Sequence, residues 1–222
     1  HIGSQITKLE PFEEAFTRVA GLVKLLREDG HNITRLDLGG GLGISYECND
    51  LPPLPSDYAK MVKRVTEHLG CRIILEPGRF LVGNAGILVS TVVYIKEGEE
   101  RKFLIVDAAM NDLIRPSMYD AYHEIVPVLE SNEDILLYDI VGPVCETGDS
   151  FASNRPITSM KTGDLLAIRS VGAYGAVMSS TYNTRKLIPE VLVKDDKFAV
   201  VRPRPTYEEI INLDHIAPWL SE

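Results

Sequence analysis

The hydrophobic pattern of the chain changes once, at the charged run KEGEERK (96–102). Before it, apolar residues recur at helical spacing in 11–28, and a second helical stripe starts near Ser56, the expected N-cap. Short apolar strands at 34–44 and 71–79 lie on either side of that second stripe. Strand, helix and strand in this order predict a β-α-β unit.

After the charged run, short stretches rich in β-branched residues alternate with Gly, Pro or Asp. This pattern predicts a mostly antiparallel β domain, closed by a short helix near 206–212. The two halves therefore favour different architectures, α/β first and β second.

Composition excludes several classes of partner. The 222 residues carry a formal net charge of −9, which argues against nucleic acid or an anionic membrane surface. The longest nearly apolar run, 80–95, contains Asn84 and is shorter than the roughly 20 residues of a membrane span. A local basic pocket for an anionic small molecule stays possible.

Three cysteines, Cys48, Cys71 and Cys145, are too few and too dispersed for a disulfide framework or a zinc cluster. We therefore predict no metal site, and a reducing cytoplasm is the simplest compartment. Cys145, in PVCETGD, is expected to be a free thiol. Composition alone favours a small buried apolar side chain there, with a chemical role as the alternative.

Two motifs end the predicted strands. LDLGGGLG (36–43) can cradle a phosphate with backbone N–H groups or can be a plain tight turn. It is not a dinucleotide fingerprint, because Ile44 stands where a glycine is needed. In LEPGR (75–79), Arg79 can hold a phosphate or carboxylate and Glu76 can accept a hydrogen bond from a ring nitrogen, or the two form an ordinary surface pair.

Three further motifs are unremarkable when each is taken alone. His1 opens the chain in HIGSQ, and a lone histidine is usually structural. Arg115 and Tyr119, in NDLIRPSMY, can simply decorate a turn. Tyr174 in GAYG lies between glycines that leave its ring room to project towards a ligand, although a buried core tyrosine is the commoner case.

The order of these motifs is more specific than any one of them. HIGSQ, LDLGGGLG, LEPGR, NDLIRPSMY, PVCETGD and GAYG resemble the successive signatures of the diaminopimelate decarboxylase family, whose members are pyridoxal-phosphate enzymes of fold type III. The resemblance implies the C-terminal portion of a cofactor-binding (β/α)8 barrel in residues 1–85 and a β-sandwich or β-barrel domain in 86–222. It also implies decarboxylation of meso-2,6-diaminopimelate to L-lysine and CO2.

The resemblance carries roles onto individual residues. It implies that His1 stacks on the pyridine ring of the cofactor and that Glu76 faces the ring nitrogen. The implied phosphate contacts are Ser4, Gly41, Gly78 and Arg79. The implied substrate contacts are Arg79, Arg115, Tyr119 and Tyr174 (which also lies near the cofactor), with Glu146 on the distal ammonium.

In the family, the residue matching Cys145 donates a proton to the substrate carbon, and the other subunit of a homodimer supplies this Cys-Glu pair. Thr147 replaces the serine that is usual in the family motif. The Schiff-base lysine of the family lies upstream of HIGSQ, and no lysine here lies in a matching motif. With no initiator Met before His1, we expect a fragment that alone lacks decarboxylase activity.

Two alternatives stay open. An ornithine or arginine decarboxylase of the same fold binds a distal cationic group and has no need of Arg115. A catalytically inactive regulatory homologue would account for the missing lysine, but it would have no reason to keep the phosphate cradle, Glu76 and Cys145 together.

Overall fold

The computed structural model describes residues 1–47 and 51–220, which fall into two compact units. The first unit comprises His1–Val89, Tyr122–Leu129 and Leu166–Tyr174. The second comprises Ser90–Ala121, Glu130–Leu165 and Gly175–Glu222. The domain boundary expected between residues 85 and 86 stays a prediction.

The first unit contains the predicted β-α-β arrangement. Strands β1 (Arg35–Asp37) and β2 (Arg72–Ile74) are parallel, and helix α2 (Pro55–Thr66) connects them. A parallel bridge between Ile6 and Leu42 adds the N-terminal segment to the same pattern. The motifs at the ends of β1 and β2 therefore emerge on the same side of the strands.

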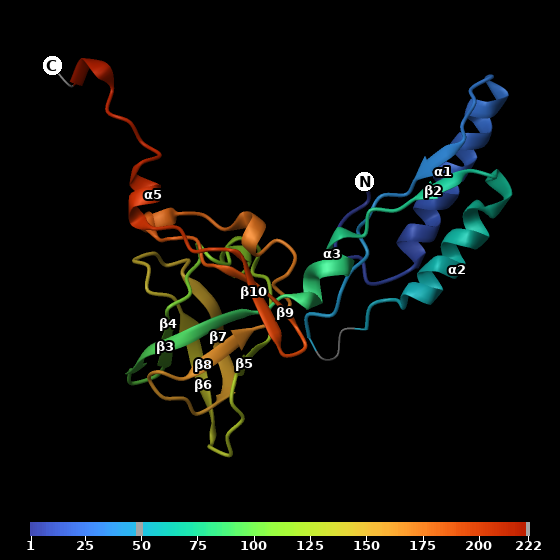
Figure 1. Ribbon diagram of the computed structural model, residues 1–222. Helices are drawn as coiled ribbons and strands as arrows, with labels where there is room; N and C mark the ends of the chain where they lie inside the picture. The colour runs from blue at the N-terminus through green and yellow to red at the C-terminus, as the bar shows by residue number, and fades with distance from the viewer. Residues whose placement is uncertain (48–50, 221–222) are drawn as a thin grey trace. The chain divides into compact units, whose positions relative to one another are not determined.

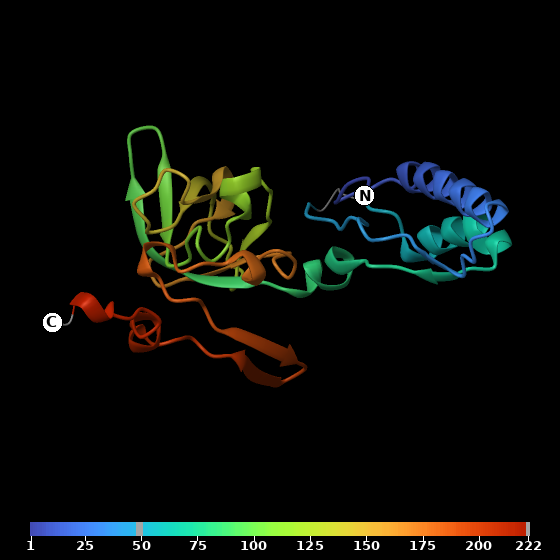
Figure 2. The same cartoon turned by 90° about the horizontal axis from the view of Figure 1, so that it is seen from above.

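Helix α1 (Glu10–Glu28) covers nearly the range expected from its apolar spacing and lies beside α2 (Figures 1 and 2). Its Phe12 is fully buried and meets the ring of Tyr58 edge-on at 5.3 Å between ring centroids. The expected N-cap of α2 was wrong. The cap is Leu54, without a side-chain hydrogen bond, because Pro55 occupies the first turn and needs no hydrogen-bond acceptor for its nitrogen.

A six-stranded sheet has the order β5-β8-β3-β4-β6-β7. The pairs β3–β4, β5–β8 and β6–β7 are antiparallel, whereas β4–β6 is parallel. The mostly antiparallel β architecture is thereby confirmed. The strands span β3 (Leu88–Glu97), β4 (Lys102–Val106), β5 (Ile125–Pro127), β6 (Ile135–Val141), β7 (Ser150–Thr158) and β8 (Leu165–Ile168).

A separate hairpin of β9 (Glu190–Lys194) and β10 (Lys197–Arg202) follows this sheet in sequence (Figure 2). Helix α5 (Tyr207–Ile211) then confirms the short helix expected near 206–212, and a capping box of Thr206 and Glu209 starts it. Two short helices that periodicity did not predict are α3 (Gly78–Val82) and α4 (Arg115–Tyr119). Single 3-10 turns are η1 (Glu67–Leu69), η2 (Gly83–Ala85), η3 (Ala176–Met178), η4 (Tyr182–Thr184) and η5 (Pro218–Leu220).

None of the helices in the described part of the chain combines the length and the apolar character needed to cross a lipid bilayer.

Candidate cofactor and substrate site

The glycine turn after β1 lies directly against the LEPGR turn after β2. Leu38 N–H donates to Ile74 C=O at 3.0 Å, and Glu76 N–H donates to Gly39 C=O at 2.8 Å. These bonds bring Gly40 so close to the Glu76 carbonyl that any Cβ at Gly40 would clash with it. Gly41 has φ +93°, and a Cβ there would lie 2.8 Å from Gly3 C=O. The turn therefore requires glycine at both positions.

A cavity of about 370 Å³ opens beside this turn. His1 and Glu76, both exposed, line it together with Gly39 and Gly40. Helix α1 closes another part of its wall with apolar side chains that include Phe12. The structure thus places two of the predicted cofactor residues, His1 and Glu76, around one cavity at the glycine turn.

Arg79 lies in the first turn of α3 and is held by three side chains. Its Nη1 donates to the Tyr46 hydroxyl, and its Nη2 donates to Ser4 Oγ at 3.2 Å. The Arg79 Cζ lies 4.8 Å from the ring centroid of Tyr174 and 5.8 Å from that of Tyr46. The guanidinium is therefore oriented by its neighbours, while its buried Nε–H has no acceptor within the described residues.

Tyr174 owes its position to an unusual backbone. Its φ is +59°, a left-handed conformation that is uncommon for a tyrosine. The neighbouring Gly172 donates its N–H to Gly83 C=O at 3.0 Å, and a Cβ on Gly172 would clash with the Val82 carbonyl. This close approach fixes the GAYG turn, and Tyr174 remains exposed instead of entering the core. Its interpretation as a core tyrosine is therefore wrong.

Sequence reasoning missed Tyr46 and His123. The ring of Tyr46 contacts that of His123 edge-on, with 5.4 Å between ring centroids. His123 is buried, and its Nδ1 lies 2.8 Å from the carbonyl oxygen of Arg169. Tyr46 follows the glycine motif by a few residues, but its contacts with Arg79 and His123 bridge 33 and 77 positions of sequence. Only its proximity to that motif could have drawn attention to it.

The second unit holds the remaining predicted residues. Arg115 begins α4 and is buried, while Tyr119 at the end of the same helix is exposed. Cys145 and Glu146 lie on the loop between β6 and β7, and both are exposed. The Tyr182 hydroxyl donates to Glu146 Oε2 over a long 3.4 Å. The interpretation of Cys145 as a buried apolar side chain is therefore wrong.

Cys71 and Cys145 are both free thiols, which confirms that expectation for Cys145. Cys48 lies outside the described residues. Among the residues that are described, no group of three or more His, Cys, Asp or Glu side chains is placed to hold a metal ion.

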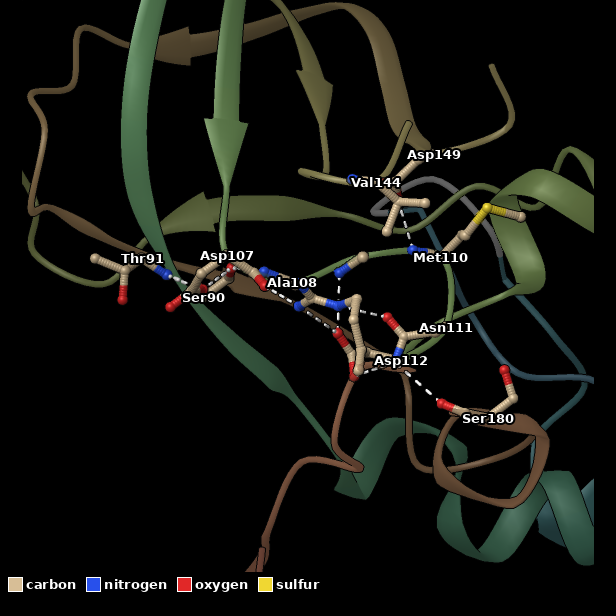
Figure 3. A network of polar contacts seen from close by, with 12 residues as sticks. Ser90, Thr91, Asp107, Ala108, Met110, Asn111, Asp112, Val144, Asp149 and Ser180 are labelled. Atoms are coloured by element: carbon tan, nitrogen blue, oxygen red, sulfur yellow. Dashed lines mark hydrogen bonds and ion pairs between the residues drawn. The ribbon is translucent and has the colours of Figure 1, made fainter. Parts of the chain in front are cut away.

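A polar network fixes the turn between β4 and α4 (Figure 3). The Arg185 Nε donates to Asn111 Oδ1 at 2.8 Å, and its Nη2 lies 3.6 Å from Asp112 Oδ2. Burial raises the pKa of Asp112, and the hydrogen bond from Ala109 N–H and the charge of Arg185 offset part of that rise. The network places Arg115 at the end of a braced turn.

Comparison with known proteins identifies the family. A family model described as the C-terminal sheet domain of pyridoxal-dependent decarboxylases matches residues 20–172. The chain belongs to the pyridoxal-dependent decarboxylases.

Three similar proteins illustrate the match. Diaminopimelate decarboxylase of Zymomonas mobilis is 52% identical over 99% of this chain and 52% of its own length. A crystal structure from Aquifex aeolicus shares 47% identity with a TM-score of 0.94, covering 96% of this chain and 53% of that one. Diaminopimelate decarboxylase from Helicobacter pylori, complexed with L-lysine, shares 41% identity with a TM-score of 0.90, covering 96% and 52%.

The chain therefore spans about half the length of the curated relatives it matches. Its likeness to these decarboxylases confirms the expected fold class, barrel elements followed by a β domain.

The residues of the first unit fit the pyridoxal phosphate that this family uses. A phosphate dianion needs several donors, and the Arg79 guanidinium, whose Nε has no acceptor among the described residues, and the adjacent Ser4 hydroxyl can supply them. A protonated pyridine nitrogen needs an anionic acceptor, and Glu76 presents an exposed carboxylate at the cavity beside that turn. The donor set therefore matches both polar ends of the cofactor.

Proposed function

We propose that the complete protein decarboxylates meso-2,6-diaminopimelate to L-lysine and CO2 with pyridoxal phosphate. The observation that carries this proposal is the Arg79 guanidinium, held between Tyr46, Tyr174 and Ser4 with no acceptor for its Nε–H within the described residues, next to the glycine turn and Glu76. Relatives named diaminopimelate decarboxylase, including the Helicobacter pylori enzyme with bound L-lysine, support the choice of substrate.

The first unit would hold the cofactor. Bound pyridoxal phosphate supplies an electron sink that stabilises the carbanion left when CO2 departs. Glu76 keeps the ring nitrogen protonated by offering it a carboxylate, and His1 covers the ring. We assign the phosphate to the Gly41 N–H, the Ser4 hydroxyl and the Arg79 guanidinium, with Gly78 beside Arg79 at the start of α3; the Gly78 N–H itself donates to Glu76 C=O at 2.8 Å.

The substrate carries an amine and a carboxylate at its non-reacting end, so the site needs both a cation and an anion there. We assign the distal carboxylate to Arg79, Arg115 and Tyr119, and the distal ammonium to Glu146. Tyr174, whose ring lies against Arg79, contacts both the cofactor and the substrate. These residue types match what the substrate requires.

Cys145 is the proposed proton donor. Its exposed thiol gives its proton to the substrate carbon that loses CO2, and the product amino acid then leaves. We further propose that Cys145 and Glu146 serve the site of a second subunit, so that the active enzyme is a homodimer. Free thiols fit a reducing cytoplasm, where we place the enzyme. The net charge of −9 gives no support for a nucleic-acid partner.

Two alternatives remain for the test. An ornithine or arginine decarboxylase would bind a distal cation, which Arg115 would repel. An inactive regulatory homologue would bind the cofactor without turnover.

The complete enzyme with pyridoxal phosphate is assayed for CO2 release from meso-diaminopimelate, L-ornithine and L-arginine. We expect turnover of meso-diaminopimelate with L-lysine as product; preference for ornithine or arginine, or no turnover of any of the three, would overturn the proposal. Cys145→Ala should lose turnover but keep the cofactor absorbance, whereas undiminished turnover would remove Cys145 from its role. Mixing inactive Cys145→Ala and Arg79→Ala subunits should restore activity, and a mixture without activity would argue against shared sites.

A further inference from the structure

Asp149 joins two segments that each carry a proposed functional residue. Its side chain is buried, with 3% of its surface exposed. One oxygen, Oδ1, accepts a hydrogen bond from Met110 N–H at 2.6 Å, and the other, Oδ2, accepts one from Val144 N–H at 2.7 Å (Figure 3). Val144 directly precedes Cys145, and Met110 belongs to the turn that leads into Arg115. A single carboxylate therefore ties the cysteine loop to that turn.

Two glycines show how closely the loop packs around this carboxylate. Gly142 donates its N–H to Asp149 C=O at 3.0 Å, and a Cβ on Gly142 would clash with the carboxylate itself. On the other side of the loop, a Cβ on Gly148 would lie 2.6 Å from Ser117 Oγ of α4. The loop thus packs closely around Asp149 and against α4.

Other hydrogen bonds hold the turn that carries Met110. Ala109 N–H donates to Asp112 Oδ2 at 2.9 Å, and Asn111 Nδ2 donates to Ser180 C=O at 3.1 Å. Arg185 holds the same turn through Asn111 Oδ1. The hydrogen bond that Met110 N–H donates to Asp149 therefore anchors the cysteine loop to a turn that several other hydrogen bonds hold.

We propose that Asp149 is a positioning residue that sets the location of the Cys145 thiol and the Glu146 carboxylate by tying their loop to the turn before α4. The inference rests on the proposed function, in which Cys145 and Glu146 act on the substrate. Asp149 does not touch the substrate; it acts through the backbone of Val144.

Burial raises the pKa of Asp149, and the N–H groups of Val144 and Met110 offset part of that rise. Both carboxylate oxygens are needed, because each faces a separate backbone donor. Asparagine is almost isosteric, but it would turn an NH2 group towards one of those N–H groups and lose that bond. Asp149→Asn is therefore the mildest change that removes one of the two hydrogen bonds joining the cysteine loop to the Met110 turn.

Asp139→Asn is the matched control. Asp139 is also buried, at 5% exposure, and accepts a hydrogen bond from Asn154 N–H at 2.8 Å, but it lies within β6. Both variants should lower the thermal stability of the enzyme. Only Asp149→Asn should change the position and reactivity of the Cys145 thiol.

The experiment uses the complete enzyme with pyridoxal phosphate. Asp149→Asn should lower kcat roughly 10- to 100-fold, because small misplacements of a reacting group have effects of this size. Its KM for meso-diaminopimelate should rise, because Glu146 is displaced with the loop, and its cofactor absorbance should change little. The rate at which iodoacetamide alkylates Cys145, followed by peptide mass spectrometry as a function of pH, should also differ from that of the wild-type enzyme. Asp139→Asn should keep the wild-type kcat and alkylation profile.

Equal loss of kcat in both variants, or an unchanged kcat and alkylation profile in Asp149→Asn, would overturn the inference. Gly142→Ala provides a second route, since its methyl group displaces the carboxylate without removing it, and it should reproduce the same alkylation change. If the wild-type enzyme did not decarboxylate meso-diaminopimelate, the proposed function would fail, but the alkylation profiles would still decide the role of Asp149.

Discussion

Replacing Gly40 with alanine puts a methyl group against the carbonyl of Glu76, at the point where the two motif turns meet. The new Cβ would lie 3.1 Å from the Glu76 carbonyl carbon and closer still to its oxygen, whereas ordinary contacts begin near 3.4 Å. The hydrogen bonds of Leu38 and Gly39 with the β2 segment resist separation of the turns. The change therefore strains the glycine turn directly.

The size of the effect follows from this overlap. Relieving it requires the turns to separate by about 1 Å, and overpacking of this kind costs about 1–3 kcal/mol. If the strain falls on the cofactor-bound form, affinity for pyridoxal phosphate weakens roughly 5- to 150-fold. The free energy of unfolding should fall by a similar amount if the strain is present without cofactor.

The assay titrates the complete apoenzyme with pyridoxal phosphate by absorbance and follows urea unfolding in parallel. Gly21→Ala is the control, because Gly21 lies in α1 and its Cβ would meet nothing within 4 Å. Alanine in a helix interior should raise stability by about 0.5–1 kcal/mol and leave cofactor affinity unchanged. If Gly40→Ala matched the wild-type enzyme in both cofactor affinity and stability, the close approach of the two turns would have no role in cofactor binding.

Two other predictions concern Tyr46 and Asp107. Tyr46→Phe removes the hydrogen bond to Arg79 but keeps the ring, so KM for meso-diaminopimelate should rise roughly 5- to 30-fold for a loss of about 1–2 kcal/mol. Steady-state kinetics check this, with the exposed Tyr94→Phe as the control, and an unchanged KM in Tyr46→Phe would contradict it. Burial raises the pKa of Asp107, but hydrogen bonds from Ser90 and Thr91 outweigh that effect and lower the pKa overall. The stabilisation from ionised Asp107 should be complete above the ordinary aspartate pKa and lost as pH falls through the lowered one. Urea unfolding of wild-type and Asp107→Asn enzyme should show a stability difference that shrinks below about pH 4, and a constant difference would refute this linkage.

Local pattern was enough for much of the fold. Helix α1 matches its apolar spacing because the side chains that share a helical face are close in sequence. The β-α-β unit and the antiparallel strands followed from periodicity and from Gly, Pro and Asp breaks. The N-cap of α2 was misplaced by two residues, because a proline at the start of a helix competes with the serine signal.

The glycine-rich and Glu-Pro-Gly-Arg motifs could also be recognised from the sequence, because a turn that requires glycine shows glycine at that position. The roles assigned to His1, Glu76 and Cys145 stay predictions, but the structure shows His1 and Glu76 at one cavity and Cys145 exposed. Exposure of Cys145 could not be read from composition, because a free cysteine is usually buried.

The sequence by itself determined the long helices, most strands and the glycine turns, because those depend on neighbours a few positions away, but it did not show the short helices α3 and α4. Tertiary structure alone decided that Tyr46 contacts Arg79, 33 positions later in the sequence. It also decided that Asp149 binds both Val144 N–H and the N–H of Met110, which lies 39 positions before Asp149. A lone tyrosine or aspartate has no periodic signature, since its partner is chosen by how distant segments pack. The motifs therefore marked the candidate site, and long-range packing supplied the residues that hold it in place.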